Sequence, residues 1–279
     1  MANYPDFGVL LTRLLDYRQT DIAWLASASG IPESDLRSVA DGVPPSASQV
    51  DGLAAALGFR TADLFVIAGL SVPEALRPCE AAAGSGLVDL IHVVMALPAD
   101  QRTHIHETVE RLPQLPRIRP ADPPRAFYQG DGGLGAMLVT MLCANRNLHS
   151  PVDAAKTLHL LTRGRMYLAG TTYGHIAAGA VPLRPTWVGG FATALGIPAA
   201  DLAAITGADL SEATPPEDPL AAEMAELLWD CRRLRASQIE HVCAEAEAML
   251  VPVPDDASGD DWNRVHHQNG TWWGAPRRG

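Results

Sequence analysis

The chain has 279 residues, of which 47% are hydrophobic and only 6% aromatic, so it is long enough for two packed domains. Its 21 basic and 32 acidic residues give a net charge of −11, which argues against non-specific binding of nucleic acid, because such binding needs a basic surface. The four cysteines are dispersed, which argues against a disulfide scaffold. The N-terminal residues do not form the pattern of a signal peptide, and no apolar run is long enough to predict a membrane span. We expect a cytoplasmic protein.

The second half of the chain is a diverged copy of the first. Residues 50–70 match residues 188–208 at 11 of 21 positions with a constant offset of 138. The match continues at an offset of 137, for example from Leu90 to Leu227 and from Gln101 to Gln238. The repeated segment is as long as a domain, so the period indicates a duplicated domain rather than a solenoid.

The first copy begins with short segments at helical spacing. Apolar residues recur from Phe7 to Leu15, and the next segment ends at Gly30, a residue type that often terminates helices. Two spaced motifs follow, Ala26-x-x-x-Gly30-Ile31 and Leu36-x-x-Val39-x-x-Gly42-x-x-Pro45. Their spacing resembles the helix-turn-helix of Cro/C1-type (XRE family) regulators.

The resemblance implies that residues 32–40 form the recognition helix, which enters the major groove of DNA in this family. Leu36 and Val39 would anchor that helix in the core, and helices at 47–57 and 62–69 would complete the unit. The residues expected to face the groove are Glu33, Ser34, Arg37 and Ser38. Of these, Ser34, Arg37 and Ser38 are the candidates for DNA contact, because hydroxyl and guanidinium groups donate hydrogen bonds to bases and phosphates.

Acidic residues count against DNA binding by the first copy. Glu33 and Asp35 place carboxylates where a phosphate backbone would pass, and residues 1–78 carry five arginines against nine acidic residues. Either this copy binds DNA through its recognition helix, or it keeps the fold without binding DNA. The sequence leaves both alternatives open.

The second copy is electrostatically better suited to DNA. Thr172-Tyr173-x-x-Ile176-x-x-Gly179 follows a longer helix, at about 152–161, and this pattern looks like the variant helix-turn-helix of nucleoid-associated and sporulation-type regulators of actinobacteria. Residues 130–210 carry five basic and four acidic residues, with no carboxylate between Lys156 and Asp201. The resemblance implies DNA contacts from Arg163, Arg165, Thr171, Thr172, His175 and Arg184. The alternative is that Tyr173 and His175 are core or surface residues of a scaffold.

Three regions lie outside these motifs. Each copy ends in two helices, at 86–112 and 219–250, which either pack within the chain or form a homodimer contact. Between the copies a proline-rich stretch is expected to be extended, and residues 111–125 within it carry four arginines and one aspartate. The composition from residue 251 onward predicts a disordered tail.

No catalytic group, metal site or cofactor is expected. His104 and His106 are two residues apart on a predicted helix, so they point to different faces and do not form a metal-binding pair. Cys231 and Cys243 are expected to be small core residues on facing helices. The glycines at 132–135 lack the Lys-Ser/Thr of a phosphate-binding loop.

The sequence thus predicts an all-α protein with two tandem helix-turn-helix units, each followed by a helical hairpin. The expected boundaries are 1–78 and 79–112 for the first unit and hairpin, 113–133 for a Pro/Arg-rich linker, 134–212 and 213–250 for the second unit and hairpin, and 251–279 for the tail. The predicted function is that of a sequence-specific transcriptional regulator that binds double-stranded DNA in the nucleoid. The alternative is a protein-interaction adaptor, whose acidic first unit binds another regulator.

Overall fold

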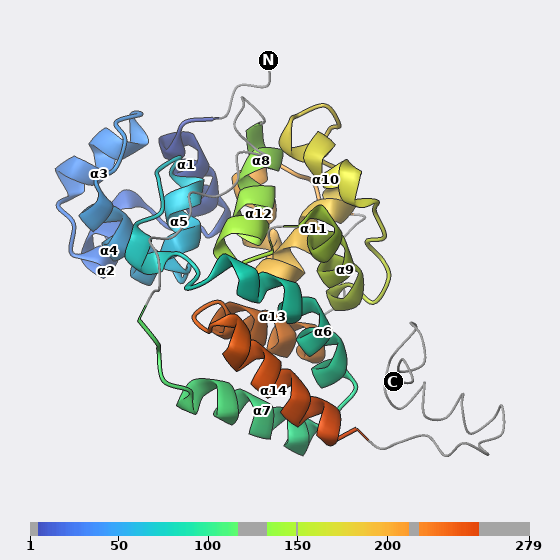
Figure 1. Ribbon diagram of the computed structural model, residues 1–279. Helices are drawn as coiled ribbons and strands as arrows, with labels where there is room; N and C mark the ends of the chain where they lie inside the picture. The colour runs from blue at the N-terminus through green and yellow to red at the C-terminus, as the bar shows by residue number, and fades with distance from the viewer. Residues whose placement is uncertain (1–4, 117–132, 149, 212–217, 251–279) are drawn as a thin grey trace.

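A computed structural model of the chain, shown in Figure 1, describes residues 5–116, 133–148, 150–211 and 218–250. Within these residues the protein has fourteen α-helices and no strand, which confirms the predicted all-α class. Most of the expected linker and the whole expected tail, residues 251–279, lie outside the described residues.

The helices form three groups. The first unit consists of α1 (Phe7–Tyr17), α2 (Ile22–Ser29), α3 (Glu33–Ala40), α4 (Ala47–Leu57) and α5 (Thr61–Ile67). The second unit consists of α8 (Gly133–Thr140), its π-helical continuation η3 (Met141–Asn145), α9 (Pro151–Leu161), α10 (Gly170–Ala177), α11 (Pro185–Leu195) and α12 (Ala199–Thr206). The bundle consists of α6 (Gly84–Met95), α7 (Ala99–Arg111), α13 (Pro219–Cys231) and α14 (Ala236–Ala248).

Local sequence explains the ends of several helices. The side chain of Asp21 accepts a hydrogen bond from the backbone N–H of Trp24 and so caps α2, which ends at Gly30 in the left-handed conformation, as predicted. Ser46 and Gln49 form a capping box at the start of α4. Gly58, with φ of 70°, ends α4 at the predicted residue.

The two hairpins pack on each other within the chain. Helix α6 lies against both α13 and α14, and α7 lies against the same two helices (Figure 1). Leu87, Ile91, Leu228 and Val242 fill the interior and have no exposed surface. Of the two arrangements that the sequence left open, the structure therefore contains the intramolecular one, and the apolar faces of the hairpins are used inside the chain.

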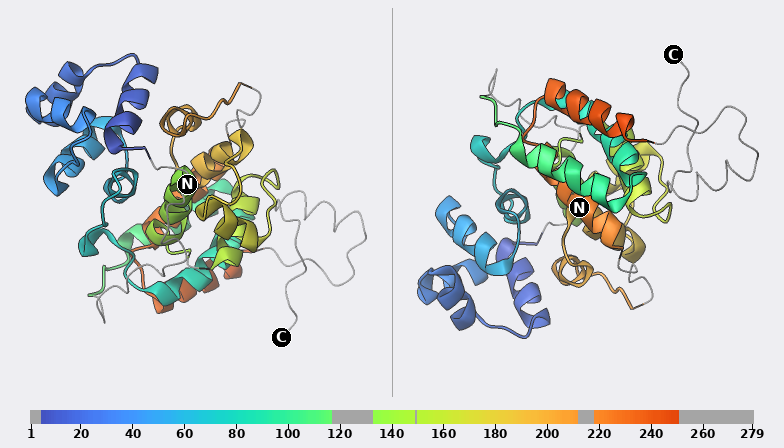
Figure 2. Two further views of the ribbon diagram at one scale, coloured as in Figure 1. Left: turned by 90° about the horizontal axis from the view of Figure 1, so that it is seen from above. Right: turned by 90° about the horizontal axis from the view of Figure 1, so that it is seen from below.

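Contacts between the units are reciprocal, as an approximate two-fold axis requires: α1 of the first unit packs on α12 of the second, and α5 of the first packs on α8 of the second. In Figure 1, α3 and α10 lie at similar heights on opposite sides of α5 and α12, and so do α2 and α9; Figure 2 shows the two units side by side from above. The bundle lies at the lower end of Figure 1, away from α3 and α10.

Two arginine–aspartate pairs cross between the units in the pattern that a two-fold axis requires. Arg18, after α1, donates to the carboxylate of Asp201 in α12 at 2.7 Å and to the carbonyl of Leu57 at 3.0 Å. Arg146, after η3, donates to the carboxylate of Asp63 in α5 at 2.8 Å, and also to the carbonyl of Leu195. Each unit therefore supplies the arginine of one pair and the aspartate of the other.

The π-helical turn η3 accounts for one extra residue in the second copy, between Gly135 and Arg146. Gly8 of α1 lies against the carbonyl of Val39, and Gly135 of α8 lies against the carbonyl of Ile176, so these glycines correspond. Arg18 lies ten positions after Gly8, whereas Arg146 lies eleven positions after Gly135. A π-turn adds one residue to a helix without ending it, and η3 supplies that residue.

Candidate nucleic-acid interface

Helix α3 is held on the first unit by the two predicted anchors. Leu36 and Val39 are fully buried, while Ser34, Arg37 and Ser38 are exposed. Helix α1 approaches α3 so closely that a Cβ on Gly8 would overlap the carbonyl oxygens of Val39 and Ala40 in the last turn of α3. The outward side of α3 is therefore the side that the family resemblance assigned to DNA.

The polar groups on this side of α3 are engaged with one another. The guanidinium of Arg37 pairs with the carboxylate of Glu33 one turn earlier. The hydroxyl of Ser38 donates to the carbonyl of Ser34 at 3.0 Å, and the hydroxyl of Ser34 donates to the carboxylate of Asp35 at 3.2 Å. A phosphate that approaches Arg37 would have to compete with a carboxylate already bound to it.

Helix α10 is anchored more deeply. Tyr173 and Ile176 are buried, and the Tyr173 ring meets Phe191 of α11 edge to face at 6.3 Å between centroids. Burial raises the pKa of the Tyr173 phenol, because the ionised form would lose its hydration. Tyr173 is thus a core residue, as the scaffold alternative proposed for it, and α10 is fixed to the unit by a large aromatic side chain.

The predicted contact residues of α10 differ in exposure. Thr171 and His175 are exposed, and Thr172 is half-buried. Within the part of the chain that the structure describes, no hydrogen bond engages these three side chains. Their hydroxyl and imidazole groups are therefore available to a ligand, in contrast to the serines of α3.

An eight-residue turn, 162–169, joins α9 to α10 and carries two of the predicted arginines. Arg163 has a φ of 52°, and its Nε donates to the carboxylate of Asp218 at 2.9 Å. Burial alone would raise the pKa of Asp218, but the bond from Arg163 and bonds from two backbone N–H groups outweigh it and hold this pKa below its usual value. Arg163 therefore ties the turn to the start of α13.

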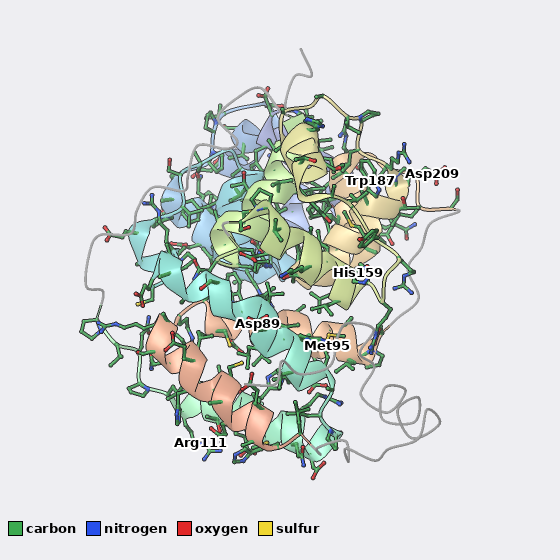
Figure 3. All side chains as sticks on the ribbon, turned by 45° about the vertical axis from the view of Figure 1, so that its right-hand side comes forward. Asp89, Met95, Arg111, His159, Trp187 and Asp209 are labelled. Atoms are coloured by element: carbon green, nitrogen blue, oxygen red, sulfur yellow. The ribbon has the colours of Figure 1, made fainter. Side chains whose placement is uncertain are left out.

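Two arginines remain near α10. Arg165 is exposed and forms no ion pair within the described residues. Arg184 precedes α11 and lies over the ring of Trp187, 5.0 Å from its centroid. Figure 3 shows Trp187 and the exposed Asp209 close together on this side of the molecule, so one carboxylate stands at its edge.

One exposed side chain beside α10 was absent from the sequence prediction. Tyr167 is 71% exposed and lies two residues after Arg165. Its ring packs edge to face against His159 of α9, with 5.2 Å between centroids. The spacing Arg163-x-Arg165-x-Tyr167 in this turn was the available signal, because arginine and aromatic residues bind nucleic acids by charge and stacking.

The charge count for the second unit needs a correction. Arg146 was included among its five basic residues, but the side chain is fully buried and paired with Asp63 of the first unit. Asp201, one of the four acidic residues, is likewise nearly buried and paired with Arg18. These charges do not reach a ligand on the surface, so the relevant cations are Lys156, Arg163, Arg165 and Arg184.

The remaining chemical candidates take structural roles. His104 lies within 2.8 Å of the carboxylate of Glu245, whereas His106 lies 3.6 Å from Glu223, so the two imidazoles face different helices, as predicted. All four cysteines are free thiols. No cluster of possible metal ligands is found within the described residues, and none of their helices has the length and apolar character needed to cross a membrane.

Comparison with known proteins gives no relative. No protein family, no curated protein and no solved structure matches the chain. The interpretation of the site therefore rests on its geometry and charge.

Proposed function

We propose that the protein is a sequence-specific DNA-binding transcriptional regulator and that α10 makes its main contact with DNA. The observation that carries the proposal is the outward side of α10, where Thr171 and His175 are exposed without side-chain hydrogen bonds among the described residues. Arg165 and Arg184 are exposed in the turns that precede α10 and α11. Side chains of these types read base edges and bind phosphates. The two arginines, rather than Arg163, are assigned the phosphate contacts, since Arg163 already has a carboxylate partner.

The first unit is assigned the weaker contact. Glu33 occupies Arg37, and Asp35 adds an exposed carboxylate on the same helix. Both charges repel a phosphate backbone, and the repulsion is strongest at low ionic strength, when salt screens it least. We expect this unit to contribute contacts only after the second unit has bound.

The approximate two-fold axis sets the expected form of the DNA site. Units related by a two-fold axis, rather than by translation, meet half-sites in inverted orientation. The two half-sites should differ in sequence because α3 and α10 present different side chains. One chain then supplies both recognition helices, and binding of the second unit becomes intramolecular, which raises its effective concentration.

The proposal is tested by selecting bound fragments from a random DNA pool and then measuring the salt dependence of affinity for the selected sequence. The variant Arg165→Ala/Arg184→Ala should bind that sequence about tenfold more weakly or worse, and the slope of log K against log salt should decrease by about 2, because two phosphate contacts are lost. Arg111→Ala removes an exposed charge from α7, far from Trp187 in Figure 3, and should change neither quantity.

A second function is favoured by a different observation. The first unit exposes the apolar side chains of Tyr17, Trp24 and Val43 near its carboxylates, as the surface of a protein-interaction adaptor would. If the chain enriches no sequence from the pool, and the double arginine variant behaves like wild type, the regulator proposal is wrong. The adaptor function then predicts that Trp24→Ser/Val43→Ser weakens binding to a protein partner while leaving the fold intact.

A further inference from the structure

A hollow with a volume of about 340 Å³ lies where three segments meet. Arg77 and Cys79 come from the connector between the first unit and the bundle. Pro116 comes from the segment that follows α7, and Arg232 and Arg233 come from the turn between α13 and α14. The volume is within the range of sites that bind small metabolites.

Arg232 is a buried cation without a carboxylate partner among the described residues. The residue is only 9% exposed; its Nη1 donates to the carbonyl of Leu76 at 2.7 Å, and its Nε has no acceptor. Its guanidinium lies 3.7 Å from the centroid of the Trp229 ring, which offers a weak partner for a charge. A buried charge normally requires an ion pair, so Arg232 lacks an anion.

Neighbouring ion pairs do not supply that anion. Two other guanidiniums also lie near Trp229: Arg146 is paired with Asp63, and Arg60 is paired with Glu226. Burial lowers the pKa of Arg232 to about 10; attraction to Asp63 opposes this effect, while repulsion from Arg146, Arg60 and Arg233 adds to it. Arg232 remains protonated at neutral pH and stands in an excess of positive charge.

The second arginine of this turn, Arg233, leaves room for an anion. Arg233 uses its Nε for a long bond of 3.4 Å to the carbonyl of Asp230, and Arg77 uses its Nε for a bond of 2.9 Å to the carbonyl of Val72. Within the described residues, no carboxylate lines the hollow. A guanidinium carries five donors, so one such bond leaves most of the group of Arg233 available.

We propose that this hollow is a binding site for a phosphate-bearing small molecule, with Arg232 as the buried partner of the phosphate and Arg77 and Arg233 at its rim. Phosphate suits these three guanidiniums, which come from the connector and from the turn after α13, because its oxygens accept hydrogen bonds in several directions. A bound phosphate would join the connector of the first unit to the bundle. The site goes beyond the proposed DNA binding and does not depend on it.

The first test is calorimetric titration of the full chain with pyrophosphate at constant ionic strength. One site per chain is expected, and Arg233→Gln should bind about tenfold more weakly, as expected when a hydrogen bond to a charged group is lost. Arg13→Gln makes the same substitution at an exposed position of α1 and should leave the affinity unchanged. Citrate that binds more tightly than pyrophosphate would contradict the assignment to phosphate.

The position of the ligand is tested separately, because variants of the buried Arg232 are at risk of misfolding. Cys79 lines the hollow, whereas Cys143 and Cys231 are buried elsewhere. In a Cys243→Ser background, pyrophosphate should slow modification of Cys79 by a thiol reagent several-fold, and Arg233→Gln should abolish this protection. Pyrophosphate that binds without protecting Cys79, or with equal affinity to Arg233→Gln, would overturn the proposal.

Discussion

The two units share an order of helices but have different surroundings. In the second unit, α9 packs on α6 and α13 of the bundle, and α11 packs on α13. In the first unit, α3 is held by α1 and α2, and the main attachment to the rest of the molecule is α1 on α12, with α5 on α8 and η3. Of the two copies, the second therefore packs directly on the bundle, whereas the first is attached mainly to the second unit.

The same difference appears on the outward sides of α3 and α10. On α3, Arg37 and Ser34 bond to carboxylates of their own helix. On α10, the side chains of Thr171 and His175 have no such bonds within the described residues. The unit that packs on the bundle is also the unit whose outward helix, α10, carries no acidic residue.

The largest expected effect is a loss of free energy of unfolding, and it should differ between the two arginine–aspartate pairs. Arg146 and Asp63 are fully buried, so Arg146→Ala should lower the free energy of unfolding by about 3–5 kcal/mol, because it leaves a buried carboxylate without a partner. The Arg18 side chain is 25% exposed, and Arg18→Ala should cost about 1–2 kcal/mol, since water can reach Asp201.

Urea denaturation monitored by circular dichroism measures both values. Arg146→Met combined with Asp63→Leu should recover most of the loss, because an apolar pair removes the buried charge together with its partner. Equal costs for Arg146→Ala and Arg18→Ala would contradict the difference in burial between the two pairs.

The next effect concerns the close approach of α1 to α3 and of α8 to α10. A Cβ on Gly8 would overlap a backbone carbonyl of α3, and a Cβ on Gly135 would overlap one of α10. Each change to alanine should therefore destabilise the protein by about 1–3 kcal/mol. Gly174 in α10 is the matched control. Nothing lies near its missing Cβ, and Gly174→Ala should stabilise the protein by about 0.5–1 kcal/mol. Thermal unfolding of the three variants distinguishes crowding from helix propensity.

Local features of the sequence predicted much of this arrangement. The ends of α2 and α4 followed from Gly30 and Gly58, because a left-handed residue terminates a helix whatever surrounds it. The buried positions of α3 followed from the spacing of Leu36 and Val39. These features depend on a few neighbouring residues and therefore appear in the sequence.

The crossing pairs could not be predicted in the same way. Asp63 and Asp201 belong to the matched repeat, but their partners lie 83 and 183 residues away. No local pattern links residues so far apart. The π-turn also places Arg146 one position later in the second copy than Arg18 is in the first. For this reason the charge count of residues 130–210 included Arg146, although its side chain is buried.

The smallest expected effect removes the electrostatic difference between α3 and α10. If the first unit is a weak DNA contact because of its carboxylates, Glu33→Gln/Asp35→Asn should tighten binding of the selected DNA about two- to fivefold at low salt, and the gain should fade as salt screens the charges. Glu240→Gln, on the exposed side of α14, is the control for net charge. Equal gains from both variants would show that α3 does not face the DNA.

The crossing of the two pairs also has a historical consequence. In a symmetric dimer of identical chains, residue i of one subunit contacts residue j of the other, and residue j contacts residue i. Arg18 with Asp201 and Arg146 with Asp63 have this reciprocity within a single polypeptide. A gene duplication that fused two subunits of such a dimer would keep both contacts, and each half could then diverge without losing its partner.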